Sequence, residues 1–192
     1  MQADTGRDCV RYCARTRQAS KVEGMRIGIG IALCLAATAV GCGKTNTPAT
    51  EATSYVKAHE AEALYVSQNI RSMRSILSSF EPELAYEIAA KARRAHDRLA
   101  KLRRRFGGSG IEGALEAGVK YRDVQLQRAA MAVGEGLKSL RNAMGTAASF
   151  LTTFGPGLQG SYTSQMARGR SQWNYGVNKI WQLAHKPHPP TL

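Results

Sequence analysis

The spacing of apolar residues along the chain is helical from Thr53 to Leu183, and no convincing stretch alternates as a strand would. The first stretch places apolar side chains three and four residues apart over four heptads, from Val56 to Phe80. Such a pattern is typical of a helix packed along its length against another helix. Thr47-Pro48 resembles an N-cap with proline in the first turn, and Pro82 ends or kinks the helix.

Three more stretches continue this pattern. The second runs from Ala85 to Phe106 and is stopped by Gly107-Gly108. The third begins at a capping box, Ser109-Gly110-Ile111-Glu112, and continues to Leu151, with Leu115 and Val119 among its apolar positions. Its glycines allow the helix to bend or a neighbouring helix to approach closely: Gly118, Gly134, Gly136 and Gly145. Gly155-Pro156-Gly157 separates it from a fourth helix, from about Ser161 to Ala184. About four amphipathic helices predict an all-α fold, either an antiparallel helical bundle or a long helical hairpin.

Composition and charge divide the chain into segments. Its 192 residues are 43% hydrophobic, which suits one compact domain, and 27 Lys and Arg against 14 Asp and Glu give a net charge of +13. We expect a basic extension at residues 1–24, either an over-extended start or a long basic leader, and a signal peptide at 25–41. A linker at 42–50 then leads to a helical domain at 51–185 and an exposed, non-helical Pro/His tail at 186–192.

The signal peptide carries the most specific motif. Arg26 precedes fourteen uncharged residues, which is short of the roughly 20 needed to span a membrane. The stretch ends in Ala39-Val40-Gly41-Cys42, which resembles the lipobox of bacterial membrane lipoproteins, with Ala39 in place of the usual Leu. An uncleaved apolar anchor or a buried core segment is the alternative interpretation.

The lipoprotein resemblance implies cleavage between Gly41 and Cys42 and acylation of Cys42 with fatty acids such as palmitate. Gly43 at the next position implies the outer membrane, facing the periplasm. A mature chain beginning at Cys42 has 151 residues, with 21 basic against 11 acidic side chains and a net charge of +10. Cys42 is then its only cysteine, so a disulfide within the chain is excluded.

A basic cluster dominates the second helix. Eight of the fifteen residues from Lys91 to Arg105 are Lys or Arg, and Asp97 is the one acidic residue among them. The candidate contacts for an anionic surface lie on one helical stripe: Lys91, Arg94, Arg98, Lys101 and Arg105. Such a stripe suits anionic lipid headgroups, lipopolysaccharide phosphates or nucleic acid, and a solvated helix face is the plain alternative.

The remaining features give little indication of chemistry. The 26 uncharged residues from Asn142 to Ala167 predict a closely packed interface of small side chains, with a membrane-inserting loop as the alternative. His59 falls on a helix seam, and His185 and His188 lack the further ligands that a metal site needs. We therefore expect no enzyme, metal or cofactor, but a lipid-anchored interaction or structural module. Its partner is an anionic lipid or an envelope protein, with nucleic acid (as in DNA uptake or transfer) as the alternative, and self-association stays open.

Overall fold

The computed structural model describes residues 47–108 and 110–192, and these residues are helical almost throughout. The elements are α2 (Pro48–Ser78), a short 3-10 turn (Pro82–Leu84), α3 (Ala85–Arg105), α4 (Gly110–Lys120), α5 (Val124–Thr153) and α6 (Leu158–Leu183). No strand occurs in this described part. The predicted all-α class is therefore confirmed, whereas the signal peptide and Cys42 lie outside the described residues, as does Ser109 of the expected capping box.

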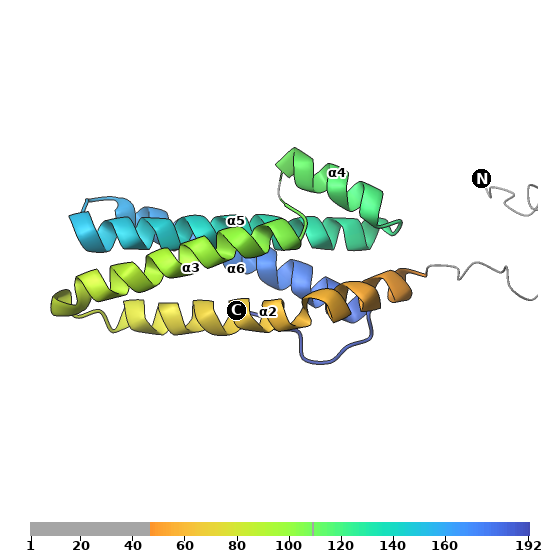
Figure 1. The fold of residues 1–192 in the computed structure, drawn as a ribbon, viewed down its shortest axis with the longest axis horizontal. Helices are drawn as coiled ribbons and strands as arrows, with labels where there is room; N and C mark the ends of the chain where they lie inside the picture. The colour runs from red at the N-terminus through yellow and green to blue at the C-terminus, as the bar shows by residue number, and fades with distance from the viewer. Residues whose placement is uncertain (1–46, 109) are drawn as a thin grey trace, which may run out of the picture. The chain divides into compact units, whose positions relative to one another are not determined.

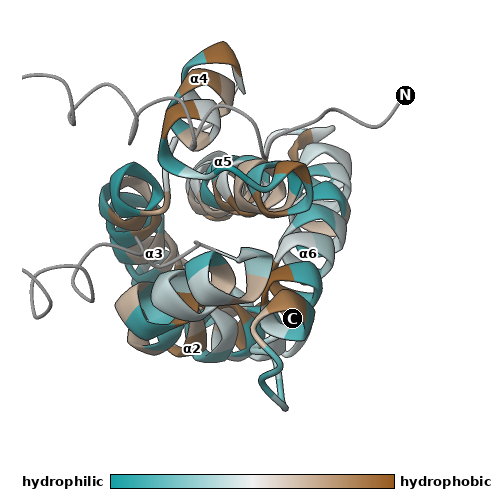
Figure 2. Cartoon of the chain, turned by 90° about the vertical axis from the view of Figure 1, so that its right-hand side faces the viewer, coloured by the Kyte–Doolittle hydropathy of each residue, from teal (hydrophilic) through white to brown (hydrophobic). Residues whose placement is uncertain are grey.

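Four of the helices form an antiparallel bundle rather than a long hairpin. Their directions alternate along the bundle in the order α2, α3, α5 and α6 (Figure 1). In the end-on view they occupy the corners of a square, with α5 between α3 and α6, and α2 opposite α5 (Figure 2). The short helix α4 lies outside this square and packs on α5. The contacts between α5 and α6 are the most extensive in the bundle.

Local sequence signals explain where the helices begin and end. The Thr47 hydroxyl accepts a hydrogen bond from the Thr50 amide and so caps α2, with Pro48 in the first turn, as predicted. The Asp123 carboxylate caps α5 by accepting from the Leu126 amide at 2.8 Å. Gly107 and Gly108 have positive φ values of 98° and 66°, which glycine adopts without strain, and they end α3.

The third predicted helix is wrong in one respect: it is two helices, α4 and α5, separated at residues 121–123. α4 buries its small residues Gly113 and Ala117 and turns Leu115 and Val119, expected in the core, to the outside, where they are 67% and 90% exposed. The apolar pattern continues through the break, but the polar residues at the break carry the cap of a new helix.

The C-terminal tail is also corrected by the structure, because its last residues fold back onto the bundle. Trp173 of α6 donates from its indole nitrogen to the carbonyl of Pro190 at 2.9 Å, and Pro190 is buried. Asn174 exchanges two hydrogen bonds with the backbone of Leu192. Ser67 and Arg71 of α2 both donate to the carbonyl of Thr191. The tail is non-helical as predicted, but these polar contacts hold its end against α6 and α2 instead of leaving it exposed.

The core fills the space between the four helices. The largest side chains of this main core that have almost no exposure belong to α2, α5 and α6: Trp173, Ile70, Leu126, Leu137, Leu140, Met144 and Ile180. At the end of the bundle where α2 stops, a small cluster of Ile88, Ala89 and Leu151 is separate from this main core.

Glycines allow α5 and α6 to approach each other closely. A Cβ added at Gly136 would lie 2.7 Å from the backbone nitrogen of Trp173, and one at Gly176 would lie 2.6 Å from the backbone oxygen of Ala129. Both distances are shorter than real Cβ contacts, so only glycine permits this separation. The close approach predicted for the glycines of this region is confirmed at Gly136.

Candidate functional site

The basic stripe of α3 lies along the side of the helix that faces α2. Another side of the helix buries Ala92, Ala95, Leu99 and Leu102 in the core, so the helix is strongly amphipathic. Arg94, Arg98, Lys101 and Arg105 are exposed, and the Lys91 side chain is 41% exposed. The five candidate residues therefore share one surface, as their spacing predicts.

Three of these cations are held in place by neighbouring side chains. Arg105 forms an ion pair with Glu62 of α2 at 2.8 Å, and the Arg98 guanidinium lies 5.2 Å from the centre of the Tyr65 ring, also on α2. Lys91 forms an ion pair with Glu87 one turn earlier on α3 at 2.7 Å. That hydrogen bond lowers the pKa of the Glu87 carboxyl below its ordinary value. Among the described residues, Arg94 and Lys101 form no ion pair.

A groove of about 480 Å³ separates α2 from α3 along this stripe. Its residues combine cations, hydroxyl and amide groups, and an aliphatic floor: Lys91, Arg94, Tyr65, Asn69, Ser72, Met73, Ile76 and Ala95. No carboxylate lines it. Lys91 is paired with Glu87, so Arg94 is the lining cation that forms no ion pair among the described residues, and with the neutral donors around it this cation suits a phosphate group.

A second cluster lies near the start of α2 and was not found from the sequence. The His59 ring stacks on Phe106 with the ring centres 4.6 Å apart, and Tyr55 lies beside both His59 and Tyr121. These residues meet from α2, the end of α3 and the end of α4, so no local spacing in the sequence points to them. A pocket of about 260 Å³ beside them includes Glu51 and Lys120.

The ionisable groups of this second cluster are shifted toward their neutral forms. Burial, and then the nearby Lys120, lowers the pKa of His59, while burial raises the pKa of Tyr55 and of Tyr121. Neither the Tyr55 hydroxyl nor the His59 Nδ1 has a hydrogen-bond partner in the structure. The seam position predicted for His59 is correct, but the nearest carboxylate, Glu62, is 3.9 Å away and does not satisfy that nitrogen. We read this cluster as part of the packing between helices.

The remaining residues that the sequence singled out do not form a site in the described part of the structure. Gly41 and Cys42 lie outside the described residues. His185 and His188 sit in the tail with positive φ, and the described residues include no group of three or more His, Cys, Asp or Glu side chains arranged to hold a metal ion. None of the described helices combines the length and apolar composition that a membrane-spanning segment requires.

The described residues form an antiparallel four-helix bundle with a cationic groove between α2 and α3. Comparison of the chain with models of protein families, with curated proteins and with solved structures finds no match. The function is therefore inferred from the chain's own residues.

Proposed function

We propose that the protein is a lipid-anchored envelope protein whose helical bundle binds an anionic membrane surface through the groove between α2 and α3. The observation that carries this proposal is the row of five cations on α3, of which Lys91 and Arg94 line the groove, with Arg94 and Lys101 forming no ion pair in the described part of the chain. Phosphate groups of anionic lipids or of lipopolysaccharide are the ligands that this chemistry favours. The bundle acts without catalysis, as an interaction or structural module.

Acylation of Cys42 supplies the anchor in this proposal, and the lipobox-like motif supports it. One lipid anchor together with a basic patch binds a membrane far more stably than either alone. The outer membrane, with the bundle in the periplasm, is the proposed location. Labelling with a radioactive fatty acid tests the anchor: wild type incorporates label and Cys42→Ala does not. Equal incorporation in both would contradict acylation of Cys42.

Helix α4 favours a membrane over a nucleic acid as the anionic surface. It begins a few residues after the basic end of α3 and exposes Ile111, Leu115 and Val119, spaced four residues apart. Exposed aliphatic side chains near a basic helix contribute to binding at a lipid interface, whereas a phosphodiester backbone gives them little to contact. Nucleic-acid binding through the same stripe is the second candidate.

Vesicle binding by the helical unit, Asn46–Leu192, tests the groove independently of the anchor. We expect binding to phosphatidylglycerol vesicles and not to phosphatidylcholine vesicles. The double variant Arg94→Gln/Lys101→Gln loses about 2 kcal/mol, or roughly thirtyfold in affinity, because each cation near such a surface contributes about 1 kcal/mol. Lys57→Gln/Lys138→Gln removes the same charge from other exposed positions and serves as the matched control.

The two candidate functions differ in their response to α4. Leu115→Gln weakens vesicle binding if α4 contacts lipid, and leaves binding to duplex DNA unchanged. Duplex DNA binding that is tighter than vesicle binding at the same salt concentration, and that falls steeply as salt rises, would support the nucleic-acid candidate instead. Equal losses in Arg94→Gln/Lys101→Gln and in its control would show that net charge, and not the basic stripe of α3, drives binding.

A further inference from the structure

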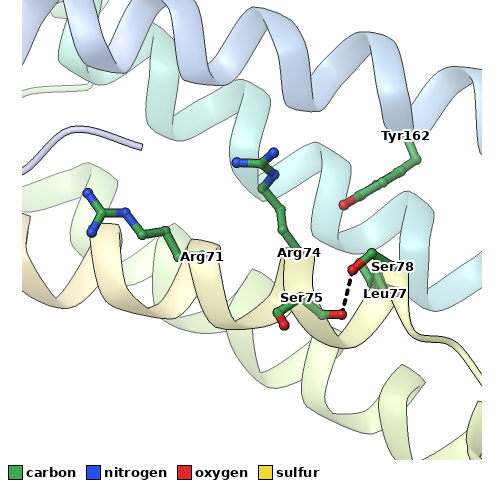
Figure 3. A pocket seen from close by; sticks show the side chains of 6 residues that line it. All are labelled: Arg71, Arg74, Ser75, Leu77, Ser78 and Tyr162. Atoms are coloured by element: carbon green, nitrogen blue, oxygen red, sulfur yellow. Dashed lines mark hydrogen bonds between the residues drawn. The ribbon is translucent and has the colours of Figure 1, made fainter.

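Two adjoining pockets lie at the end of the bundle where α2 stops, away from the cationic groove on α3. The first has a volume of about 440 Å³ and is polar, with Arg71, Arg74, Ser75, Leu77, Ser78 and Tyr162 around it (Figure 3). The second has a volume of about 270 Å³ and is mainly apolar, lined by Leu77, Phe80, Ala147, Phe150, Leu151, Gln159, Tyr162 and Thr163. Leu77 and Tyr162 line both, so the two pockets adjoin at these side chains.

The polar pocket has the chemistry of an anion site. Arg74 of α2 and Tyr162 of α6 extend into the same space from opposite walls (Figure 3). Burial raises the pKa of the Tyr162 phenol, with the nearby Arg74 acting against the rise, so Tyr162 is a neutral hydroxyl donor. No carboxylate lines this pocket, and neither α6 nor the part of α2 beyond Glu62 contains one.

The neighbouring Arg71 is already positioned by the tail. Its guanidinium donates to the carbonyl of Thr191 at 2.6 Å, and Ser67 donates to the same oxygen at 2.7 Å. In Figure 3 this guanidinium points away from Arg74. Arg74 is therefore the principal cation of the pocket, and Arg71 adds positive charge at its edge.

The apolar pocket has the chemistry of a hydrocarbon site. Most of its lining belongs to the uncharged stretch from Asn142 to Ala167, at the end of α5 and the start of α6. It lies beside the small cluster containing Leu151, which is separate from the main core, so the side chains at this end leave space between them. Phe150 and the 56% exposed Phe154 have ring centres 6.1 Å apart and add aromatic surface at the same end.

We propose that these two pockets together bind one anionic, single-chain amphiphile. Its carboxylate or phosphate group lies at Arg74 and the Tyr162 hydroxyl, and its hydrocarbon chain enters the apolar pocket past Leu77. The polar pocket alone reaches the roughly 300–1,000 Å³ of small-molecule sites. Charge selects the head, and the adjoining apolar lining selects the chain. This site is independent of the membrane-binding groove and of the anchor at Cys42.

Calorimetric titration with three ligands of equal chain length tests the proposal: decanoate, decyl phosphate and the uncharged decanol, each below the concentration at which it aggregates. We expect one site per chain that binds decanoate or decyl phosphate at least tenfold more tightly than decanol, because a charge-assisted hydrogen bond contributes on that order. The preference between the first two distinguishes a fatty acid from a phosphate-bearing lipid. Equal affinity for all three would overturn the proposed head site.

Variants locate the ligand within the two pockets. Arg74→Gln weakens anion binding about tenfold, and Tyr162→Phe about fivefold, whereas Arg168→Gln, at an exposed arginine of α6 outside both pockets, leaves it unchanged. Thr163→Trp places an indole at the mouth of the apolar pocket and abolishes chain binding without altering the core, since Thr163 is exposed. Circular dichroism checks that each variant folds. Wild-type affinity in both Arg74→Gln and Thr163→Trp would overturn the proposal. Unchanged amphiphile binding in Arg94→Gln/Lys101→Gln would confirm that this site is separate from the groove between α2 and α3.

Discussion

Replacing Gly176 with alanine is the most direct test of how the bundle is held together. Alanine forms helices better than glycine by about 1 kcal/mol, so helix propensity alone predicts a gain in stability. The structure predicts the reverse, because the new Cβ would lie 2.6 Å from the Ala129 backbone oxygen and 2.7 Å from a methyl of Val133. The backbone oxygen cannot avoid the clash by rotating, so α5 and α6 must separate until that contact reaches about 3.4 Å.

The cost of that separation exceeds the gain in helix propensity. Overpacking a well-filled core costs about 1–3 kcal/mol, and a shift between two backbones belongs at the upper end of this range. The buried side chains at this interface, including Trp173 and Val177, lose part of their dispersion contacts as the helices move apart. The net effect of Gly176→Ala is therefore a loss of about 2 kcal/mol in the free energy of unfolding.

Urea denaturation of the unit Asn46–Leu192, followed by circular dichroism, measures this loss. The matched control is Gly160→Ala in the same helix, where an added Cβ meets no atom within 4 Å. The control gains up to about 1 kcal/mol, less near the helix end, and so shifts the midpoint in the opposite direction. If both variants were stabilised, the close contact between α5 and α6 would not exist as described.

Three smaller changes test other parts of the fold. The pKa of His59 is lower in the folded protein than in the unfolded chain, so as the pH falls the imidazole is protonated in the unfolded state first. The free energy of unfolding is therefore greatest above pH 6.5 and decreases below it. Thermal unfolding at pH 7 and pH 5 should show this decrease in wild type and much less of it in His59→Phe. Asp123→Ala removes the cap of α5 and costs about 1 kcal/mol in urea denaturation, and an unchanged midpoint would contradict the capping role. Asn174→Ala breaks both hydrogen bonds to Leu192, and the NMR order parameter of the Leu192 amide falls below about 0.6; a value near 0.85 would show that the tail is held by other contacts.

Local signals in the sequence predict the helices well, because capping and helix-breaking residues act on their own neighbours. Thr47-Pro48 and Pro82 mark ends that the structure confirms. The break before Val124 was missed although Asp123 is a good cap, since Leu115 and Val119 continue the apolar period up to it. Helical spacing also predicts the shared surface of the α3 cations, but it does not indicate that α2 lies along that surface.

The pockets and the docked tail were beyond prediction because they join residues far apart in the sequence. The polar pocket needs Arg74 and Tyr162 on opposite walls, and the tail needs donors from Ser67 and Asn174. In the sequence, each of these residues is an ordinary polar residue on its own helix, with nothing to mark it as part of a site. Only the packing of α2 against α6 brings them together, and single-sequence periodicity carries no information on which helices are neighbours.

Both proposed sites follow from the position of α2 in the bundle. Glycines let the backbones of α5 and α6 lie close to each other, whereas the contacts of α2 with α3 and α6 are much less extensive. Bulky side chains such as Tyr55, Ile70 and Met73 separate α2 from the rest of the bundle. A groove consequently opens on each side of α2, toward α3 and toward α6, and arginines line both. Thr191 accepts from Ser67 and Arg71 of α2, and Pro190 and Leu192 bond to Trp173 and Asn174 of α6, so the docked tail links the two helices at Arg71, on the edge of the polar pocket in which we place the amphiphile's head.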